Sequence, residues 1–397
     1  MILFITRKYP PSVGGMQKLS YRLTTEISRQ TTAKVIGWGG SQRWLPVFVP
    51  WAFLRALAVL ARGQVTLIHL SDPVLAPLGV LMRWLARVPV VVNAHGLDVT
   101  YSFPPYQAIV PWCLRRLDRV ICISRYTRDE CIRRGVPADH CEVIPLGIDT
   151  EEYRTSLSEV ERRTWLSAWG IHPTPSGPRR SGMDAEYGSL RDGVPTERRR
   201  FLLTVGRLVR RKGLLPFVSQ TLPLLHAQRQ DWIYLIVGDG PERQRLEAAV
   251  QTLGLSEQVR ILGFLGREAI QAAYALADLF IMPNVPTPGD PEGFGLVTLE
   301  ARAAGAPVVA ANLEGIRDAI TEEADGTLVT AEDWPGFAKA IESWLDRGES
   351  TVDREARRRR TAARFAWPQI AARYMAVFDQ ARAQRGTSQG GRLEDRH

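Results

Sequence analysis

Pro291-Glu292-Gly293-Phe294-Gly295-Leu296-Val297-Thr298-Leu299-Glu300 places two carboxylates eight positions apart across a glycine-rich turn that leads into a helix. Gly293 and Gly295 tolerate positive φ and let the backbone approach a bound group. The free N–H groups at the start of the following helix suit an anion, so the stretch fits a nucleotide with phosphates. Glu300, about two helical turns beyond Glu292, is placed to accept hydrogen bonds from ribose hydroxyls, with Glu292 nearer the reacting end.

Four further motifs accompany this pair, each near the end of an expected strand. They are Gly14-Gly15-Met16-Gln17, Asn93-Ala94-His95-Gly96, Val205-Gly206-Arg207-Leu208 with Lys212-Gly213, and Val237-Gly238-Asp239-Gly240-Pro241. In this order, and with the Glu-x7-Glu pair, they resemble the retaining glycosyltransferases of family 4, also called glycosyl transferases group 1. The resemblance covers most of the chain. It implies the α/β GT-B fold, in which two Rossmann-like parallel-sheet domains face a central cleft and a C-terminal helix crosses back to the first domain.

Short apolar runs alternate with helical patterns in both halves of the chain, which predicts two parallel sheets covered on both faces. The expected strands of the first half are Ile2–Thr6, Ala33–Trp38, Val65–Leu70, Val88–Asn93, Arg119–Ile123 and Glu142–Pro145. Those of the second half are Phe201–Val205, Trp232–Val237, Val259–Leu262, Leu279–Met282, Pro307–Ala310 and Thr327–Val329. Helices are expected over Glu242–Leu253 and Arg267–Ala275.

Composition marks the stretch between the domains, and the resemblance implies what the domains do. It implies an acceptor-side domain over residues 1–154, joined by the C-terminal helix 367–383, and a nucleotide-sugar domain over 201–366. Between them, 155–200 is an insertion in which a Pro- and Gly-rich, charged stretch from about 170 predicts partial disorder. The tail 384–397 is also expected to be disordered.

Length and hydropathy bound the class of protein. At 397 residues the chain is too long for one ordinary core and suits two domains. No apolar run reaches the roughly 18 to 20 residues of a spanning helix, and the opening Met1–Thr6 is too short for a signal segment. We therefore expect a cytoplasmic protein. Peripheral attachment to the inner face of the cell membrane is compatible with this expectation.

The formal charge of +9 comes from the first half, where residues 1–150 hold 18 Lys and Arg against 9 Asp and Glu. A basic surface confined to one domain suits an anionic membrane or a phosphate-bearing lipid acceptor, and a solvated Arg-rich surface explains it equally well. No nucleic-acid module is evident, so nucleic acid ranks well below a membrane.

A helix from Trp51 to Arg62 carries Arg55 and Arg62 on one side and Phe53, Leu54, Leu57 and Leu60 on the other. A buried core helix has the same pattern, and that explanation is preferred here. Arg83, Trp84, Arg87, Trp112, Arg115 and Arg116 in later helices support the alternative, a surface that rests on anionic lipid.

Four cysteines, Cys113, Cys122, Cys131 and Cys141, stand at spacings of 9, 9 and 10 residues. These are not zinc-site spacings, and in a cytoplasmic chain they predict reduced, buried thiols without a function. No metal and no cofactor are expected, because the nucleotide-diphosphate sugar is a co-substrate.

The resemblance assigns roles to strand-end residues of the second domain. Arg207 and Lys212 would neutralise the leaving diphosphate, a task that fixed cations perform without a metal. Backbone and carboxylate contacts to the donor are implied for Gly14, Gly15, Gly206, Gly238, Phe294, Gly295, Leu296 and Glu300.

His95 would hydrogen-bond the donor sugar at its hydroxymethyl group and shape the reacting geometry. Glu292 invites the role of nucleophile in a double displacement. The resemblance favours a front-face transfer in which Glu292 binds sugar hydroxyls. Asp98 and Ser124 are weaker acceptor-side candidates.

Two stretches depart from the family pattern. Leu146 stands where Asn often precedes Gly147-Ile148-Asp149, and Glu314-Gly315-Ile316-Arg317-Asp318 replaces a more usual Gly-Gly-x-Pro-Glu. Both weaken any transfer of donor or acceptor identity.

The motifs together predict a retaining glycosyltransferase that moves a sugar from GDP-mannose, UDP-glucose or UDP-N-acetylglucosamine to a lipid-linked or cell-envelope glycan. A catalytically inactive sugar-nucleotide sensor or scaffold on the same fold is the alternative, although the retained His95, Arg207, Lys212, Glu292 and Glu300 argue against it. A dehydrogenase is disfavoured because no Gly-x-Gly-x-x-Gly follows the first strand and no acidic residue closes the second.

Overall fold

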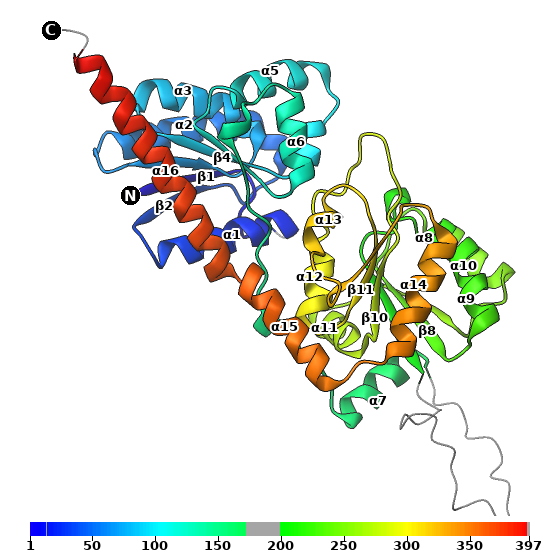
Figure 1. Ribbon diagram of the computed structural model, residues 1–397. Coiled ribbons are helices and arrows are strands. Elements are labelled where there is room, and N and C mark those ends of the chain that lie inside the picture. The colour runs from blue at the N-terminus through cyan, green and yellow to red at the C-terminus, as the bar shows by residue number, and fades with distance from the viewer. Residues whose placement is uncertain (13, 172–198, 395–397) are drawn as a thin grey trace, which may run out of the picture.

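The computed structural model of the protein describes residues 1–12, 14–171 and 199–394, with the backbone alone for 386–394. It has two lobes, each a six-stranded parallel sheet with helices on both faces (Figure 1). The prediction of two Rossmann-like sheets is confirmed. Of the expected insertion 155–200, residues 159–168 form helix α7 and residues 172–198 lie outside the described part.

The N-terminal lobe has strand order β2-β1-β3-β4-β5-β6. Its strands are β1 (Ile2–Thr6), β2 (Ala33–Gly37), β3 (Leu67–Leu70), β4 (Val90–Ala94), β5 (Arg119–Cys122) and β6 (Cys141–Val143). Its helices are α1 (Gly15–Ser28), η1 (Gln42–Trp44), α2 (Leu45–Leu60), η2 (Pro73–Leu75), α3 (Ala76–Ala86), α4 (Leu97–Thr100), α5 (Pro104–Leu114), α6 (Arg125–Arg133), η3 (Ala138–His140) and η4 (Thr150–Glu152). Every residue of β1, β3, β4 and β5 is buried, as their unbroken apolar runs require.

The C-terminal lobe has strand order β12-β11-β10-β7-β8-β9. Its strands are β7 (Arg200–Val205), β8 (Trp232–Val237), β9 (Val259–Gly263), β10 (Leu279–Met282), β11 (Val308–Ala311) and β12 (Gly326–Val329). Its helices are α7 (Glu159–Ala168), η5 (Arg210–Lys212), α8 (Leu214–Pro216), η6 (Phe217–Thr221), α9 (Leu222–Gln228), α10 (Arg243–Thr252), α11 (Arg267–Leu276), α12 (Leu296–Ala303), α13 (Ile316–Ala319), α14 (Trp334–Arg347) and α15 (Thr351–Phe365). All twelve predicted strands are present, with ends shifted by up to two residues.

The last helix, α16 (Trp367–Glu394), returns to the N-terminal lobe as predicted. Its apolar side chains, including Trp367, Ile370 and Phe378, form one buried cluster with Ile2 and Phe4 of β1. The tail expected to be disordered from Gln384 is helical as far as Glu394. Arg385 explains this, because its guanidinium binds the Asp118 carboxylate at 3.1 Å and the carbonyl oxygens of Val88 and Arg83.

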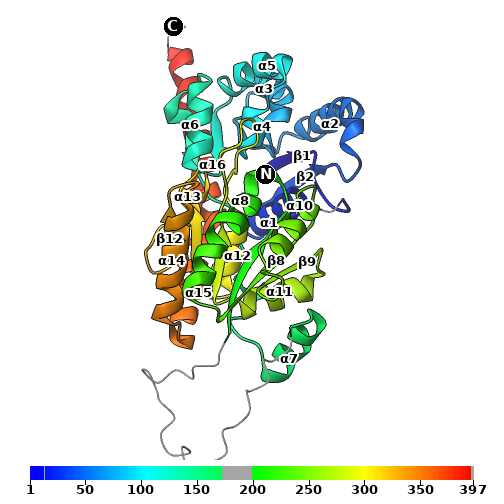
Figure 2. The same ribbon diagram turned by 90° about the vertical axis from the view of Figure 1, so that its right-hand side faces the viewer.

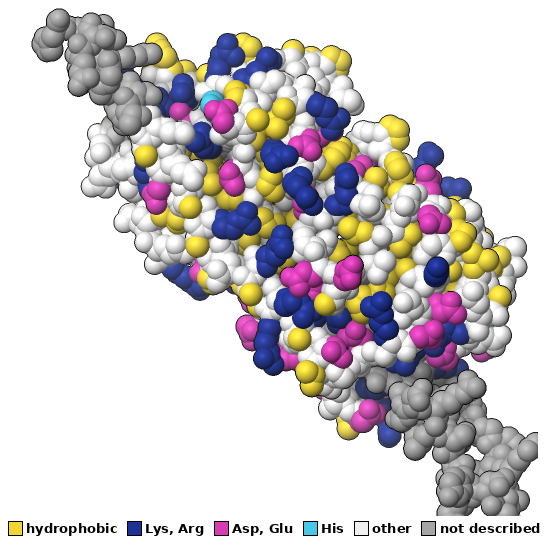
Figure 3. Space-filling model, in the orientation of Figure 1, with side chains coloured by type: hydrophobic (Ala, Val, Ile, Leu, Met, Phe, Trp, Pro, Cys, Tyr) yellow, Lys and Arg dark blue, Asp and Glu magenta, His cyan; other side chains and the backbone are white. Residues whose placement is uncertain are grey.

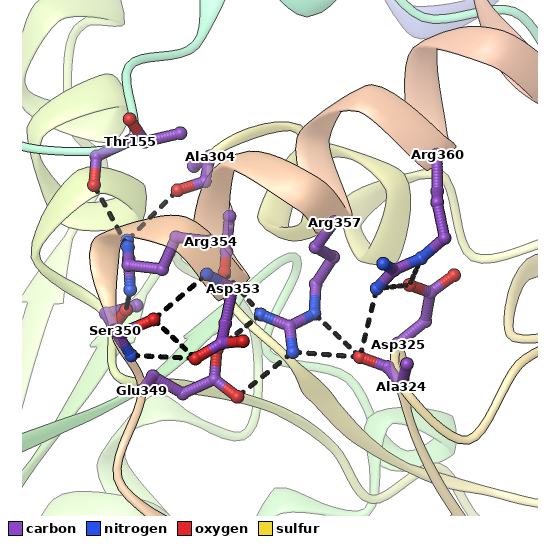
Figure 4. A network of polar contacts seen from close by, with 12 residues as sticks. Thr155, Ala304, Ala324, Asp325, Glu349, Ser350, Asp353, Arg354, Arg357 and Arg360 are labelled. Carbon is purple, nitrogen blue, oxygen red and sulfur yellow. Dashed lines mark hydrogen bonds and ion pairs between the residues drawn. The ribbon is translucent and has the colours of Figure 1, made fainter.

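Helix α15 carries four consecutive arginines, Arg357–Arg360, and Arg357 and Arg360 of this run, together with Arg354, hold the helix in place (Figure 4). The buried Arg357 donates to the carbonyl oxygens of Gly305 and Ala324 and to Glu349. Arg354 donates to four carbonyl oxygens, those of Thr155, Ala275, Ala277 and Ala304. These bonds satisfy carbonyls that helix and strand ends leave unpaired, so they fix α15 to the lobe and to the segment that joins the lobes.

Charge of both signs covers the lower lobe, where basic and acidic side chains lie next to one another (Figure 3). Many of these neighbours are ion pairs, such as Arg360 with Asp325 at 2.9 Å. The excess of Lys and Arg therefore belongs to the N-terminal lobe, as the sequence predicts.

Helix α2 differs from its prediction in extent and in orientation. It begins at Leu45, because Pro46 lies in the first turn, where its missing N–H is not needed, and it continues through Pro50. Its buried residues are Phe48, Ala52, Ala56 and Val59, whereas the expected core residue Leu54 is 65% exposed. The preferred explanation of a core helix therefore holds for the inner side, where Phe53, Leu57 and Leu60 also pack against the lobe's core, and fails only for Leu54.

The apolar helix is also longer than the sequence analysis expected. By length and composition, one helix of the described residues could cross a membrane: the 19 residues Gln42–Leu60, with mean hydropathy 1.4. The expectation that no run reaches this length is contradicted because the chain stays helical through both prolines.

Candidate functional site

The two lobes meet at the carboxyl ends of their strands, where open α/β sheets bind ligands. The His95–Gly96 turn after β4 touches the Gly293 turn of the other lobe, since a Cβ added to Gly96 would lie 3.1 Å from the Gly293 Cα. A Cβ on Gly293 would collide with the His95 carbonyl oxygen. Glycine at 293 is therefore what allows the two motif turns to pack backbone to backbone.

Glu292 is held by cations at this junction. Its Oε2 accepts from Lys212 Nζ at 2.6 Å and from Asn284 Nδ2 at 3.2 Å, and Arg211 Nε lies 3.5 Å away. Burial alone would raise the pKa of Glu292, but the charges of Lys212 and Arg211 and the two hydrogen bonds outweigh it, so the pKa is lowered. Glu292 is therefore an ionised carboxylate at neutral pH.

Glu300 has a different environment. Helix α12 begins at Leu296, so Glu300 lies in its second turn and not two turns beyond Glu292 as expected. Its Oε2 accepts from the Tyr274 hydroxyl at 2.7 Å, and Tyr153 of the interlobe segment is a second hydrogen-bonding neighbour. Burial raises the pKa of Glu300 in spite of these bonds. The pKa values of the two glutamates are thus shifted in opposite directions, that of Glu292 down and that of Glu300 up.

Arg207 and Lys212 follow β7, but they are not equivalent. Lys212 is buried and bound to Glu292, while Arg207 is exposed and forms no ion pair with any described residue. Gly238, after β8, has φ 135°, and a Cβ there would collide with the carbonyl oxygen of Gly206. This close approach keeps the ends of β7 and β8 open to a ligand beside Arg207.

His95 carries an unused acceptor. Its Nε2 lies 2.9 Å from the Ser71 carbonyl oxygen, and because a carbonyl can only accept, Nε2 holds the proton. Nδ1 is then the acceptor of the neutral ring, and it is buried without a hydrogen-bond partner in the described structure. The ring lines a small cavity of about 20 Å³ with Thr6, Ser20 and Asn93. A hydroxyl group would satisfy this nitrogen.

The two weak acceptor-side candidates have structural roles. Ser124 is fully buried and caps α6, since its Oγ accepts from Thr127 N at 3.1 Å and lies 3.0 Å from Thr127 Oγ1. In this structure its hydroxyl faces the start of α6 and not the surface. Asp98 accepts from the His95 main-chain N–H at 2.8 Å, so it shapes the His95 turn, and burial raises its pKa.

Most of the remaining donor-side candidates lie at the first turns of helices α1 and α12. Gly14 is the N-cap of α1, and Gly15 is the first residue of that helix. A Cβ added to Gly15 would stand in open space. Gly295 has φ 81° and caps α12, and Leu296 begins that helix. Phe294 is buried against Phe365, so only its backbone is available to a ligand.

Several site residues escaped the sequence analysis. Asn284 and Arg211 contact Glu292, and Asn284 stands two residues after β10, so the strand-end rule applied elsewhere could have found it. Glu314 has φ 46° and its carboxylate accepts from the Glu292 main-chain N–H. It occupies a position where the family pattern has glycine, which agrees with its left-handed backbone.

Metal-binding side chains do not cluster in the described residues: no group of three or more His, Cys, Asp or Glu is arranged to hold an ion. The four cysteines are buried and free, as predicted, with 3.9 Å between the sulfurs of Cys122 and Cys131.

Comparison with known proteins agrees with this geometry. The family model "Glycosyltransferase Family 4" matches residues 7–152, and "Glycosyl transferases group 1" matches residues 190–364. The two matches coincide with the two lobes.

Among curated relatives, a GDP-mannose-dependent alpha-(1-6)-phosphatidylinositol monomannoside mannosyltransferase of Mycolicibacterium smegmatis is 28% identical, over 86% of this chain and 88% of the relative. A 2-deoxystreptamine glucosyltransferase of Streptomyces kanamyceticus is 26% identical, over 85% and 83%. Among solved structures, Anabaena HepE in complex with UDP superimposes with a TM-score of 0.70 at 19% identity, covering 96% of this chain and 99% of that one.

Proposed function

Because this chain belongs to glycosyltransferase family 4 and is a glycosyltransferase that acts with nucleotide-sugar donors, we propose that it transfers a hexose with retention to a lipid-linked or cell-envelope glycan. GDP-mannose is the first candidate donor, because the M. smegmatis relative carries it in its name. UDP-glucose and UDP-N-acetylglucosamine follow. The observation that carries the proposal is the Lys212–Glu292 pair beside an exposed Arg207 where the two sheets meet.

The proposed role of the cations is to bind and neutralise the diphosphate. Arg207 is exposed and pairs with no acidic side chain of the described residues, and Lys212 can exchange part of its contact with Glu292 for a phosphate oxygen. Charge on the diphosphate grows as the bond to the sugar breaks, so these fixed cations stabilise the transition state more than the ground state. A metal ion is not required for this step in the proposed mechanism.

Transfer proceeds on one face of the sugar. The bond from the anomeric carbon to the phosphate oxygen breaks while the acceptor oxygen bonds to the same carbon from the same side. The acceptor's proton passes to the departing phosphate oxygen, and the nucleoside diphosphate leaves. Glu292, ionised by its neighbours, accepts hydrogen bonds from sugar hydroxyls, and His95 Nδ1 accepts another.

We also propose that the reaction takes place at the inner face of the cell membrane. Four buried free thiols suit a reducing compartment, and the basic N-terminal lobe suits an anionic acceptor or surface.

The test uses the full chain. Thermal shift with the three donors and their nucleoside diphosphates ranks binding, and turnover with membrane extract is followed by NMR of the new anomeric centre at early times. Lys212→Ala is expected to lower transfer by about 10²-fold. The control is Lys339→Ala, which removes an exposed lysine of α14. An inverted anomeric centre would refute retention, and donor binding without transfer to any acceptor would favour the sensor.

A further inference from the structure

Large apolar side chains are exposed on one part of the N-terminal lobe. Twelve of them, each at least 41% exposed, lie between Trp44 and Trp112, against five in the rest of the described chain. They belong to η1, α2, α3, α4 and α5 and the turns beside them; α3 and α5 lie at the end of the lobe away from the other sheet (Figure 2), and α4 lies nearer the other lobe. The twelve side chains include Trp44, Leu54, Trp84, Phe103, Ile109 and Trp112. We call this surface the aromatic face.

The charge of this segment has one sign. From Ser41 to Arg116 the chain has seven arginines, no lysine, and two carboxylates, Asp72 and Asp98. Asp72 is 1% exposed and pairs with Arg7 at 2.9 Å, and Asp98 turns inward to the His95 N–H. The segment Ser41–Arg116 therefore contributes no exposed carboxylate to the aromatic face.

Arginine and tryptophan are paired on it. The guanidinium of Arg116 lies 3.7 Å from the ring centre of Trp112, and that of Arg55 lies 5.7 Å from the ring centre of Trp51. An indole ring with a cation beside it matches the boundary between acyl chains and phosphates, where the ring is half immersed and the cation meets an anion.

Helix α2 lies along such a boundary and does not cross it. Although Gln42–Leu60 is long enough to span a bilayer, Phe48, Ala52, Ala56 and Val59 are buried in the lobe's main core cluster. Removing the helix from the lobe would expose that core to water. A helix anchored on one face and apolar on the other has the geometry of an interfacial helix.

The aromatic face adjoins the catalytic edge. Gln42 of η1 exchanges two hydrogen bonds with Arg7, directly after β1, at 2.7 and 2.8 Å. Leu97, 44% exposed, begins α4 two residues after His95. A lipid held in a bilayer under this face thus has its headgroup beside the β1 and β4 strand ends.

We propose that the aromatic face docks on the interface of a bilayer containing anionic phospholipid and that it receives the lipid-linked acceptor there. Docking itself stands on the exposed side chains, and only the delivery of the acceptor rests on the proposed function. Apolar insertion supplies the larger part of the binding, and the arginines add preference for anionic headgroups.

The experiment is flotation of the full chain with vesicles of phosphatidylcholine alone or with about a quarter phosphatidylglycerol. The variant Leu54→Ser/Trp84→Ser removes side chains that are 65% and 76% exposed, and Val160→Ser/Val352→Ser, both 76% exposed in the other half of the chain, is the matched control. We expect binding to anionic vesicles to weaken about tenfold in the first variant and to stay unchanged in the second.

Equal binding by both variants, or no binding by the unaltered chain, would overturn the proposal. A change of oligomeric state in Leu54→Ser/Trp84→Ser by sedimentation, without a change on vesicles, would assign the face to a second copy instead. Donor cleavage without acceptor is measured in parallel. Normal donor cleavage with lost docking leaves the proposed function standing, and docking without any donor turnover refutes the function alone.

Discussion

Asp318 of α13 accepts two hydrogen bonds from Arg125 of α6, 193 residues earlier in the chain, and so ties one lobe to the other across the mouth of the site (Figure 2). One bond comes from the Arg125 main-chain N–H at 2.8 Å, at the first residue of α6, where an N–H has no partner within the helix. The other comes from the guanidinium. Asp318 stands where the family pattern has glutamate, so the variant motif Glu314–Asp318 retains a carboxylate for this contact.

Removing this tie should impair catalysis more than stability. We expect Asp318→Ala to lower kcat/KM about three- to tenfold, because the lobes lose a contact that holds the site closed. The melting temperature should change little, since Arg125 is exposed and exposed pairs contribute about 1 kcal/mol or less. Asp129→Asn removes an exposed carboxylate of α6 as the control. Equal kinetics in the two variants would exclude a role in closure.

The Lys212–Glu292 pair should show strong coupling. Lys212→Met leaves a buried carboxylate with a longer contact to Arg211, so we expect a loss of about 2–3 kcal/mol in the free energy of unfolding. Adding Glu292→Gln removes that uncompensated charge, and the double variant should recover part of the loss. Denaturant unfolding of the four proteins measures the cycle. Strictly additive effects would show that the pair is not coupled.

The two glutamates should affect stability at opposite ends of the acidic range. The pKa of Glu292 is lowered in the folded state, so its contribution is complete above the ordinary value of 4.5 and is lost as the pH falls through the folded pKa. The pKa of Glu300 is raised, so folding loses free energy as the pH rises from 4.5 through the folded pKa.

Glu292→Gln should therefore destabilise the protein above pH 4.5 and less below it. Glu300→Gln should become relatively more stable than the unaltered chain as the pH rises. Denaturant unfolding across pH 4 to 8 checks both, with Glu268→Gln, an exposed carboxylate of α11, as the reference. Parallel profiles for the two variants would contradict the opposite shifts.

Ser124 should matter for stability alone. Its hydroxyl caps α6, so Ser124→Ala should cost about 1 kcal/mol of unfolding free energy and leave the KM for the acceptor unchanged. Ser124→Asp, which restores a capping oxygen, should recover part of the stability. A raised acceptor KM in Ser124→Ala with normal stability would return this residue to the acceptor site.

The strands were predictable because burial on both faces leaves a simple trace in the sequence, as in Val90–Ala94 and Trp232–Val237. Site residues at strand ends, His95 and Lys212 among them, could be placed for the same reason. The orientation of α2 was not predictable, because an apolar helix has the same composition whether its outer side meets protein or lipid. The Arg125–Asp318 contact joins distant segments and has no local pattern.

The partners of Glu300 show a further limit. Tyr274 and Tyr153 read as ordinary core aromatics, and only the three-dimensional arrangement brings their hydroxyls to one carboxylate. Likewise, the arginine run of α15 resembles a solvated or nucleic-acid-binding stretch in the sequence, and only the structure shows that Arg357 and Arg360 donate to carbonyl oxygens of other elements.

The return of α16 has a consequence for how the protein is made. One side of the first sheet, with Ile2, Phe4, Leu67 and Val91, is buried in a cluster that includes Ile370, Tyr374 and Phe378 of α16. On the ribosome these α16 residues emerge only after the second sheet has been translated. The lobe that is translated first is therefore completed only after the second lobe. A nascent chain stalled before residue 367 exposes apolar side chains of the first sheet, which a chaperone would bind.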